Sequence, residues 1–121
     1  MSDIQHLVEQ YIGIWNEADP ALRTWKIAEV FAENGSYTDP LADVTGRAAF
    51  GEVVAGAQAQ FAGLVFTLGP VDAHHNIARF TWELGPAGGE SLVVGFDVVS
   101  VGTDGLIHSV HGFLDKVPAG A

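Results

Sequence analysis

The chain has 121 residues, of which 48% are hydrophobic and 17% charged, and it contains no cysteine. This composition predicts one globular domain with a single core, and it excludes a disordered chain, a disulfide framework and a thiol nucleophile. The formal net charge of −10 disfavours nucleic acids and anionic membranes as partners, because both need clustered basic residues. No apolar run reaches the about 20 residues of a membrane span, and the N-terminal sequence lacks a signal-peptide pattern. We therefore expect a cytoplasmic protein.

The first half of the chain has the apolar spacing of three helices. Apolar residues three and four positions apart predict a helix over residues 3–18. Asp19-Pro20 predicts the start of a second helix, with an N-cap and a first-turn proline, and Asn34-Gly35 predicts its end. A short strand over residues 36–39 and a turn-rich loop follow, and then a third helix over residues 47–61.

From residue 63 the pattern changes to the alternation that is typical of strands. Turn residues at 86–89 and 102–105 predict hairpins between the later strands. Helices followed by hairpin-linked strands predict an α+β fold, a cone-shaped curved antiparallel sheet wrapped around three N-terminal helices. The open end of the cone would form a pocket. The predicted strands cover residues 64–68, 71–75, 77–84, 91–101 and 106–117.

Asp97 interrupts an otherwise apolar strand, residues 93–99. An ionised carboxylate is costly to bury unless it is hydrogen-bonded or paired, so a buried Asp97 must be one of these or protonated. Strand alternation groups Asp97 with Val93, Gly95 and Val99 on one face. If this face looks into the pocket, Asp97 is a pocket acid with a raised pKa. If it looks outward, Asp97 is a solvated or dimer-interface acid.

Two further polar residues stand out, Tyr11 and Asp39. Tyr11 lies on the apolar side of the first helix, where a core tyrosine usually finds a partner for its hydroxyl. Asp39 opens an Asp-Pro turn after the short strand, a position that suits ordinary turn chemistry and equally a general base in a cleft. A phenol and two carboxyls facing one apolar pocket could carry out proton transfer.

The order of elements resembles the nuclear-transport-factor-2-like fold, specifically its SnoaL-like and ketosteroid-isomerase-like branches, as a single SnoaL-like domain over residues 1–121. The matching motifs are the stretch from Tyr11 to Asp19, with Asn16 five residues after the tyrosine, then Asp39-Pro40 after a strand, and Asp97 before the last hairpin. The resemblance implies that Tyr11 binds an oxyanion and that Asp39 is a general base. It also implies that Asp97 is a neutral hydrogen-bond donor, for which ketosteroid isomerase is an established example.

Arg79 and His108 have two interpretations each. Arg79 alternates with Phe80 and Trp82, so it either enters the cavity to bind a polar group or lies on the outer sheet face. We favour the outer face, which usually forms a homodimer in folds of this kind. His108 has the parity of pocket-facing residues and could act as an acid, a base or a hydrogen-bond partner. Equally, it could simply begin a hydrophobic strand.

Several large aromatic residues are core candidates that would also line an apolar ligand pocket. None of the five histidines has the spacing of a metal site, so we expect neither a metal nor a cofactor. The aromatic candidates are Trp15, Trp25, Phe50, Phe61 and Trp82.

The sequence therefore predicts a small-molecule pocket protein that resembles a cofactor-independent isomerase, or a lyase or cyclase of the SnoaL-like type. It would transfer a proton next to the carbonyl of a hydrophobic ligand, through Tyr11, Asp39 and Asp97. One alternative is a non-catalytic binding domain for a hydrophobic metabolite. Another is a hydratase or hydrolase with an Asp-activated water. We expect a homodimer, and no nucleic-acid or membrane partner.

Overall fold

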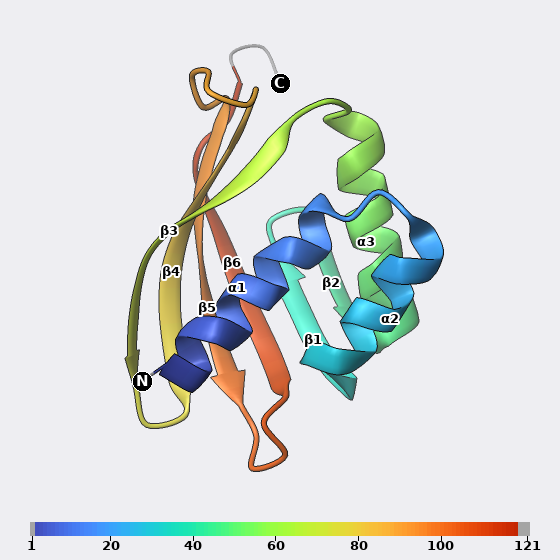
Figure 1. Cartoon of the computed structure of the whole chain (residues 1–121), viewed down its shortest axis with the longest axis vertical. Helices are drawn as coiled ribbons and strands as arrows, with labels where there is room; N and C mark the ends of the chain where they lie inside the picture. The colour runs from blue at the N-terminus through green and yellow to red at the C-terminus, as the bar shows by residue number, and fades with distance from the viewer. Residues whose placement is uncertain (1, 119–121) are drawn as a thin grey trace.

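Three helices pack against a curved six-stranded sheet in the computed structural model, which describes residues 2–118 (Figure 1). Residues 1 and 119–121 lie outside the described part, so the domain bounds of 1–121 stay a prediction. Within the described part, no helix is long and apolar enough to cross a membrane. The elements are α1 (Ser2–Asn16), α2 (Pro20–Val30), β1 (Phe31–Asp39), β2 (Ala42–Thr45), α3 (Arg47–Gln60), β3 (Val65–His74), β4 (Ile77–Gly85), β5 (Val93–Val101) and β6 (Ile107–Lys116).

The strand order across the sheet is β2-β1-β6-β5-β4-β3. Helix α1 contacts β3, whereas α3 contacts β1 and β2, so the helices cover one face of the sheet (Figure 1). This arrangement confirms the predicted α+β cone. The sheet is not wholly antiparallel, however, because β1 pairs with β6 in the parallel direction. That pairing joins the helical half of the chain to the last strand, and local sequence patterns do not report such distant contacts.

Helix α2 ends at Val30, several residues before the predicted stop at Asn34-Gly35. Phe31 is already extended, with φ −110° and ψ 132°, and it pairs with Ile107 of β6. Gly35 therefore lies inside β1, where a Cβ atom would approach the Phe31 ring to 2.9 Å. The glycine is needed for close packing and not for a left-handed helix end.

Strand β1 begins at Phe31, whereas the sequence predicted a strand over residues 36–39, and two further strands also differ from the prediction. The loop expected after residue 39 contains β2, which pairs back onto β1 through Ser36↔Thr45 and Asp39↔Ala42. The two strands expected between residues 64 and 75 form the single edge strand β3, with an irregular register between Leu68 and Val71. The dipeptide between those residues contains a proline, which cannot donate a ladder hydrogen bond and is tolerated on an edge strand.

The core is an aromatic cluster between the helices and the inner face of the sheet. Phe50 of α3 is fully buried and lies at its centre, with its ring centroid 4.6 Å from that of Phe31 and 5.9 Å from that of Tyr11. Trp15 packs edge-on against Phe50 at 5.7 Å. Burial of each such ring contributes on the order of 1.5–3 kcal/mol before conformational entropy is counted.

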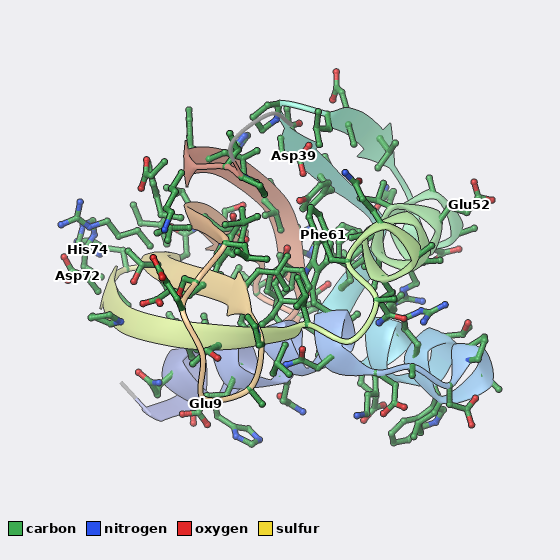
Figure 2. The ribbon with its side chains drawn as sticks, turned by 90° about the horizontal axis from the view of Figure 1, so that it is seen from above. Glu9, Asp39, Glu52, Phe61, Asp72 and His74 are labelled. Carbon is green, nitrogen blue, oxygen red and sulfur yellow. The ribbon has the colours of Figure 1, made fainter. Side chains whose placement is uncertain are left out.

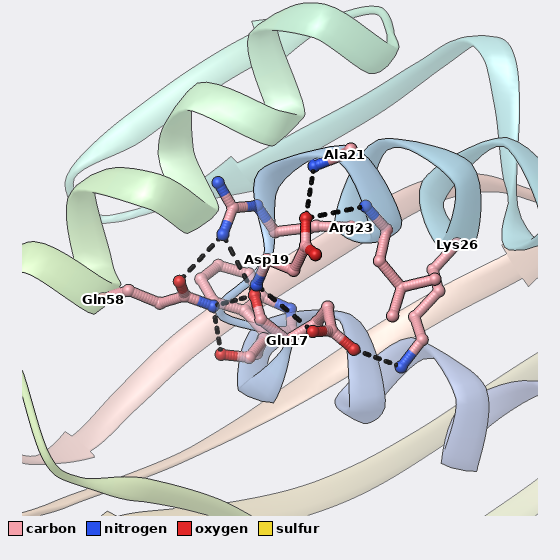
Figure 3. A network of polar contacts seen from close by, with 8 residues as sticks. Glu17, Asp19, Ala21, Arg23, Lys26 and Gln58 are labelled. Atoms are coloured by element: carbon pink, nitrogen blue, oxygen red, sulfur yellow. Dashed lines mark hydrogen bonds and ion pairs between the residues drawn. The ribbon is translucent and has the colours of Figure 1, made fainter.

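A partly buried polar network joins the end of α1 to α2 and α3 (Figure 3). The Arg23 guanidinium donates to the Glu17 carbonyl at 3.0 Å and to the Gln58 side-chain oxygen at 2.8 Å. Gln58 in turn donates to the carbonyls of Trp15 and Glu17, at 3.0 and 2.8 Å. Asp19 caps α2 as predicted, because its side chain accepts the backbone N–H of Ala21. These bonds fix the direction of the α1 end that carries Trp15.

Candidate functional site

The two carboxyls of interest meet on the inner face of the sheet, on either side of Gly112. Asp97 of β5 pairs with Gly112 of β6 in the strand register. A Cβ atom at Gly112 would lie 2.9 Å from Asp97 Oδ1 and 3.3 Å from the Cβ of Asp39 at the end of β1. A glycine in β6 therefore leaves the space in which the two acids approach each other.

Asp97 is 4% exposed and accepts a hydrogen bond at Oδ1 from the indole nitrogen of Trp82, at 3.1 Å. Burial raises the pKa of the Asp97 carboxyl from its ordinary value of 3.8 to about 7. The hydrogen bond from Trp82 lowers this pKa, whereas the neighbouring charge of Asp39 raises it. The nearby hydroxyl of Tyr11, a donor group, lowers it. A large fraction of Asp97 is thus neutral near pH 7 and able to donate a hydrogen bond.

Asp39 is partly exposed, and both of its carboxylate oxygens accept hydrogen bonds. Oδ1 accepts the backbone N–H groups of Leu41 and Ala42, each at 2.8 Å, which is the turn chemistry expected of an Asp-Pro sequence. Oδ2 accepts the hydroxyl of Tyr37 at 2.6 Å. All three of these hydrogen bonds are donated to the Asp39 side chain, two from backbone N–H groups and one from a phenol hydroxyl.

The Tyr11 hydroxyl is fully buried and forms no hydrogen bond with any of the described residues. Burial raises its pKa well above the ordinary 10.0, and the nearby carboxylate of Asp97 raises it further. The group therefore stays a neutral donor near neutral pH. A buried hydroxyl without a partner loses about 1–3 kcal/mol relative to a satisfied one, so an acceptor placed beside Tyr11 would be bound favourably.

Three of the predicted aromatic residues, Trp15, Phe50 and Trp82, contact this group, and the fourth, Phe61, lies at the end of α3. Trp15 is buried against Tyr37, with ring centroids 5.7 Å apart, and Phe50 is stacked on Tyr11. Trp82 is half-buried and bonds Asp97 directly. Phe61 is half-buried at the end of α3. Figure 2, a view from above, shows Phe61 there and Asp39 on the β1–β2 side of the fold.

Three other predicted residues lie outside the group. Trp25 is 61% exposed on the outer side of α2, because the inner stripe of that helix is formed by Arg23, Ile27 and Val30. Arg79 lies on the outer sheet face, the side that we favoured, and its side chain is 72% exposed beside Asp72 at 3.7 Å.

His108 is also placed away from the carboxyls, although its parity predicted an inward direction. The register of β5 and β6 shifts between Ser100↔Ser109 and Val101↔Ile107, which makes His108 the extra residue of a bulge. A bulge breaks the two-residue alternation on which the prediction depended. The imidazole is exposed and contacts Asp104 in the hairpin turn at 3.0 Å.

Sequence reasoning missed Tyr37 and Gly112 as site residues. Tyr37 stands two positions before Asp39 on the same strand, so alternation alone places both side chains on one face. Gly112 could be recognised only in part, because a glycine within a strand indicates that other atoms pack closely against it but does not identify those atoms.

Two surface recesses lie away from the carboxyl pair. One, of about 330 Å³, lies beside β3 and β4 and includes Arg79, Thr81 and Phe96 in its lining. The other, of about 260 Å³, lies between α1 and α2 beside Trp25. Neither is lined by Asp39, Asp97 or Tyr11.

Within residues 2–118 no group of three or more His, Asp or Glu side chains could hold a metal ion.

Comparison with known proteins gives a family and a close structural relative. Residues 8–110 match the model of the SnoaL-like domain. A proposed isomerase of the SnoaL-like family from Agrobacterium tumefaciens strain C58 is 36% identical to this chain, with a TM-score of 0.90. The alignment covers 96% of this chain and 100% of that one. Among curated proteins, none matches the chain.

Two more distant structures share the fold. A proposed ketosteroid isomerase from Kribbella flavida is 22% identical with a TM-score of 0.72, over 99% of this chain and 83% of that one. A proposed polyketide cyclase from Sinorhizobium meliloti is 20% identical with a TM-score of 0.69, over 88% and 93%. At these identities the likeness shows the fold alone. The family match, in contrast, spans Tyr11, Asp39 and Asp97, and the chain belongs to the SnoaL-like family.

Proposed function

We propose that the protein is a cofactor-independent isomerase or cyclase that removes a proton next to the carbonyl of a neutral, hydrophobic compound. The observation that supports this proposal is the approach of Asp39 and Asp97 on either side of Gly112, beside the Tyr11 hydroxyl, which has no hydrogen-bond partner among residues 2–118. The names of the related structures, a proposed isomerase and a proposed cyclase, agree with such chemistry. The net charge of −10 disfavours anionic substrates.

We assign the roles from the raised pKa values of Tyr11 and Asp97 and from the hydrogen bonds that Asp39 accepts. Tyr11 and neutral Asp97 donate hydrogen bonds to the carbonyl oxygen, and these bonds strengthen as the enolate charge develops. Asp39 accepts the proton from the adjacent carbon as the C–H electron pair passes into the enolate. In an isomerase, Asp39 returns the proton at another carbon. In a cyclase, the enolate carbon forms a bond to a second carbonyl carbon of the same substrate, the π electrons of that carbonyl pass to its oxygen, and the resulting alkoxide takes the proton from Asp39.

The test is incorporation of deuterium next to the carbonyl of hydrophobic ketones, including β,γ-unsaturated ones, followed by NMR in D₂O. We expect exchange by the wild type and a loss of roughly 100-fold or more in Asp39→Asn, because general base catalysis contributes about 10²–10⁴-fold. Asparagine keeps a side-chain oxygen for the turn. The matched control is Asp43→Asn, since Asp43 is exposed on the neighbouring β2 and bonds Thr38 instead.

A binding protein without catalysis is the second candidate. It is favoured by the hydrogen bonds that Leu41, Ala42 and Tyr37 donate to Asp39, because they explain the carboxylate as part of a turn. In that case hydrophobic ketones would quench the fluorescence of Trp15 and Trp82, while wild type and Asp39→Asn would show equal, uncatalysed exchange. This result would reject the isomerase and cyclase proposals together.

A further inference from the structure

The buried side chain of Tyr37 forms a hydrogen bond directly with Asp39, the proposed base. Its side chain is 4% exposed, and its hydroxyl donates to Asp39 Oδ2 at 2.6 Å. We propose that Tyr37 is a positioning residue that holds Oδ2 of Asp39 as the oxygen that takes the substrate proton. This role rests on the proposed function, because it assigns the geometry of the same base.

The two oxygens of Asp39 differ in how many acceptor positions they have left. Oδ1 accepts two backbone N–H groups, from Leu41 and Ala42, each at 2.8 Å. A carboxylate oxygen offers about two acceptor positions, so those of Oδ1 are filled. From the described part of the chain, Oδ2 accepts only the Tyr37 hydroxyl, which leaves one acceptor position for the substrate proton. When the substrate C–H bond breaks, the new O–H bond therefore forms on Oδ2, and the electron pair moves to the carbonyl oxygen through the enolate.

The core fixes the direction from which Tyr37 donates. Its ring centroid lies 5.3 Å from that of Phe50 and 5.7 Å from that of Trp15. Burial raises the pKa of Tyr37, and the hydrogen bond to Asp39 raises it further, so the hydroxyl remains a donor at neutral pH. A ring held on two sides leaves its hydroxyl little freedom, and the bond restricts rotation of the Asp39 carboxylate about its own side-chain torsion.

The variant Tyr37→Phe removes the hydroxyl and keeps the ring. We expect kcat for exchange next to the carbonyl to fall roughly 10- to 100-fold with KM unchanged, because the base is still present but less well aimed. The matched control is Thr38→Val, at the next position of β1. Its hydroxyl bonds Asp43 at 3.2 Å, away from Asp39, so both kinetic constants should stay at the wild-type level.

A spectroscopic measurement separates the hydrogen bond from general packing. The hydrogen-bonded Tyr37 hydroxyl should give a protected proton resonance in the wild type and in Thr38→Val. The resonance should be lost in both Tyr37→Phe and Asp39→Asn, whereas a purely packing role of the ring would not depend on Asp39.

The outcomes separate this role from the proposed function. Loss of exchange in Asp39→Asn but full kcat in Tyr37→Phe overturns the positioning role and leaves the proposed function standing. Persistence of the hydroxyl resonance in Asp39→Asn also overturns the role. Wild-type exchange no faster than that of Asp39→Asn overturns the proposed function, and the positioning role with it.

Discussion

Asp97 shows how one buried carboxyl can make the stability of the fold depend on pH. In the folded protein its pKa is raised to about 7 by burial, whereas an exposed aspartate has its ordinary value of 3.8. Between these two values the folded state binds more protons than the unfolded state. Because stability falls with pH wherever the folded state binds the extra proton, the neutral form stabilises the fold and ionisation removes that contribution.

We therefore expect the free energy of unfolding to fall by on the order of a few kcal/mol as the pH rises from about 4 to about 7. Asp97→Asn should abolish this part of the slope, because asparagine is neutral throughout and keeps an oxygen for the Trp82 hydrogen bond. The measurement is urea unfolding of both proteins at several pH values. The other carboxyls are common to the two proteins. If the free energy of unfolding therefore changed with pH by the same amount in both, Asp97 would not be the titrating group.

At the scale of elements, Asn16 at the end of α1 explains how a helix holds an edge strand. Its amide nitrogen donates to the carbonyl of Phe66, and its oxygen accepts the backbone N–H of Phe66, both at 2.8 Å. The side chain thus pairs with β3 as a neighbouring strand would. Phe66 in turn packs against Trp15 and Trp82, with centroid distances of 5.4 and 5.7 Å. Asn16, which is part of the family motif, therefore holds in place the strand whose Phe66 packs against Trp15 and Trp82.

Asn16→Ala should loosen the start of β3 without unfolding the protein. Loss of two exposed hydrogen bonds costs about 1–2 kcal/mol locally, which corresponds to amide exchange roughly 10-fold faster at Phe66. Hydrogen exchange followed by NMR measures this rate. Gln10→Ala, an exposed change on the same helix, serves as the control. Equal Phe66 exchange in the two variants would contradict a role of Asn16 in holding the strand.

On the scale of the whole molecule, the outer face of the sheet carries an exposed aromatic pair. Phe113 of β6 is 51% exposed and stacks on Phe96 of β5 at 5.0 Å. Ile77 of β4 is also exposed, at 37%. Exposed apolar groups that gather on one face are typical of protein interfaces. We propose that this face pairs two copies of the chain, as the resemblance to the fold family led us to expect.

Phe113→Glu should convert such a dimer to a monomer, because it places a charge in the middle of an apolar contact. Light scattering after gel filtration measures the molar mass directly. The control is Ala48→Glu, which adds the same charge on the exposed side of α3. A wild type that is monomeric at high protein concentration, or a variant that stays dimeric, would contradict this interface.

The α+β class, the three helices and most strands follow from the sequence, because apolar spacing and turn residues are local signals. Helix α3 and strand β4 lie within one residue of their predicted bounds. Asp97 could likewise be singled out, since a carboxylate in an apolar strand is costly anywhere. Tyr11 and Asp39 could be noticed from the apolar side of the first helix and from the Asp-Pro turn, and the family resemblance implied their roles.

Only the tertiary structure decided which groups meet. The parallel pairing of β1 with β6 brings Asp39 beside Gly112, and the pairing of β5 with β6 brings Asp97 to the other side. The bulge at His108 turned a predicted pocket residue into a hairpin residue. Contacts between distant strands and shifts in register depend on the packing of the whole sheet, and a local pattern carries no information about them.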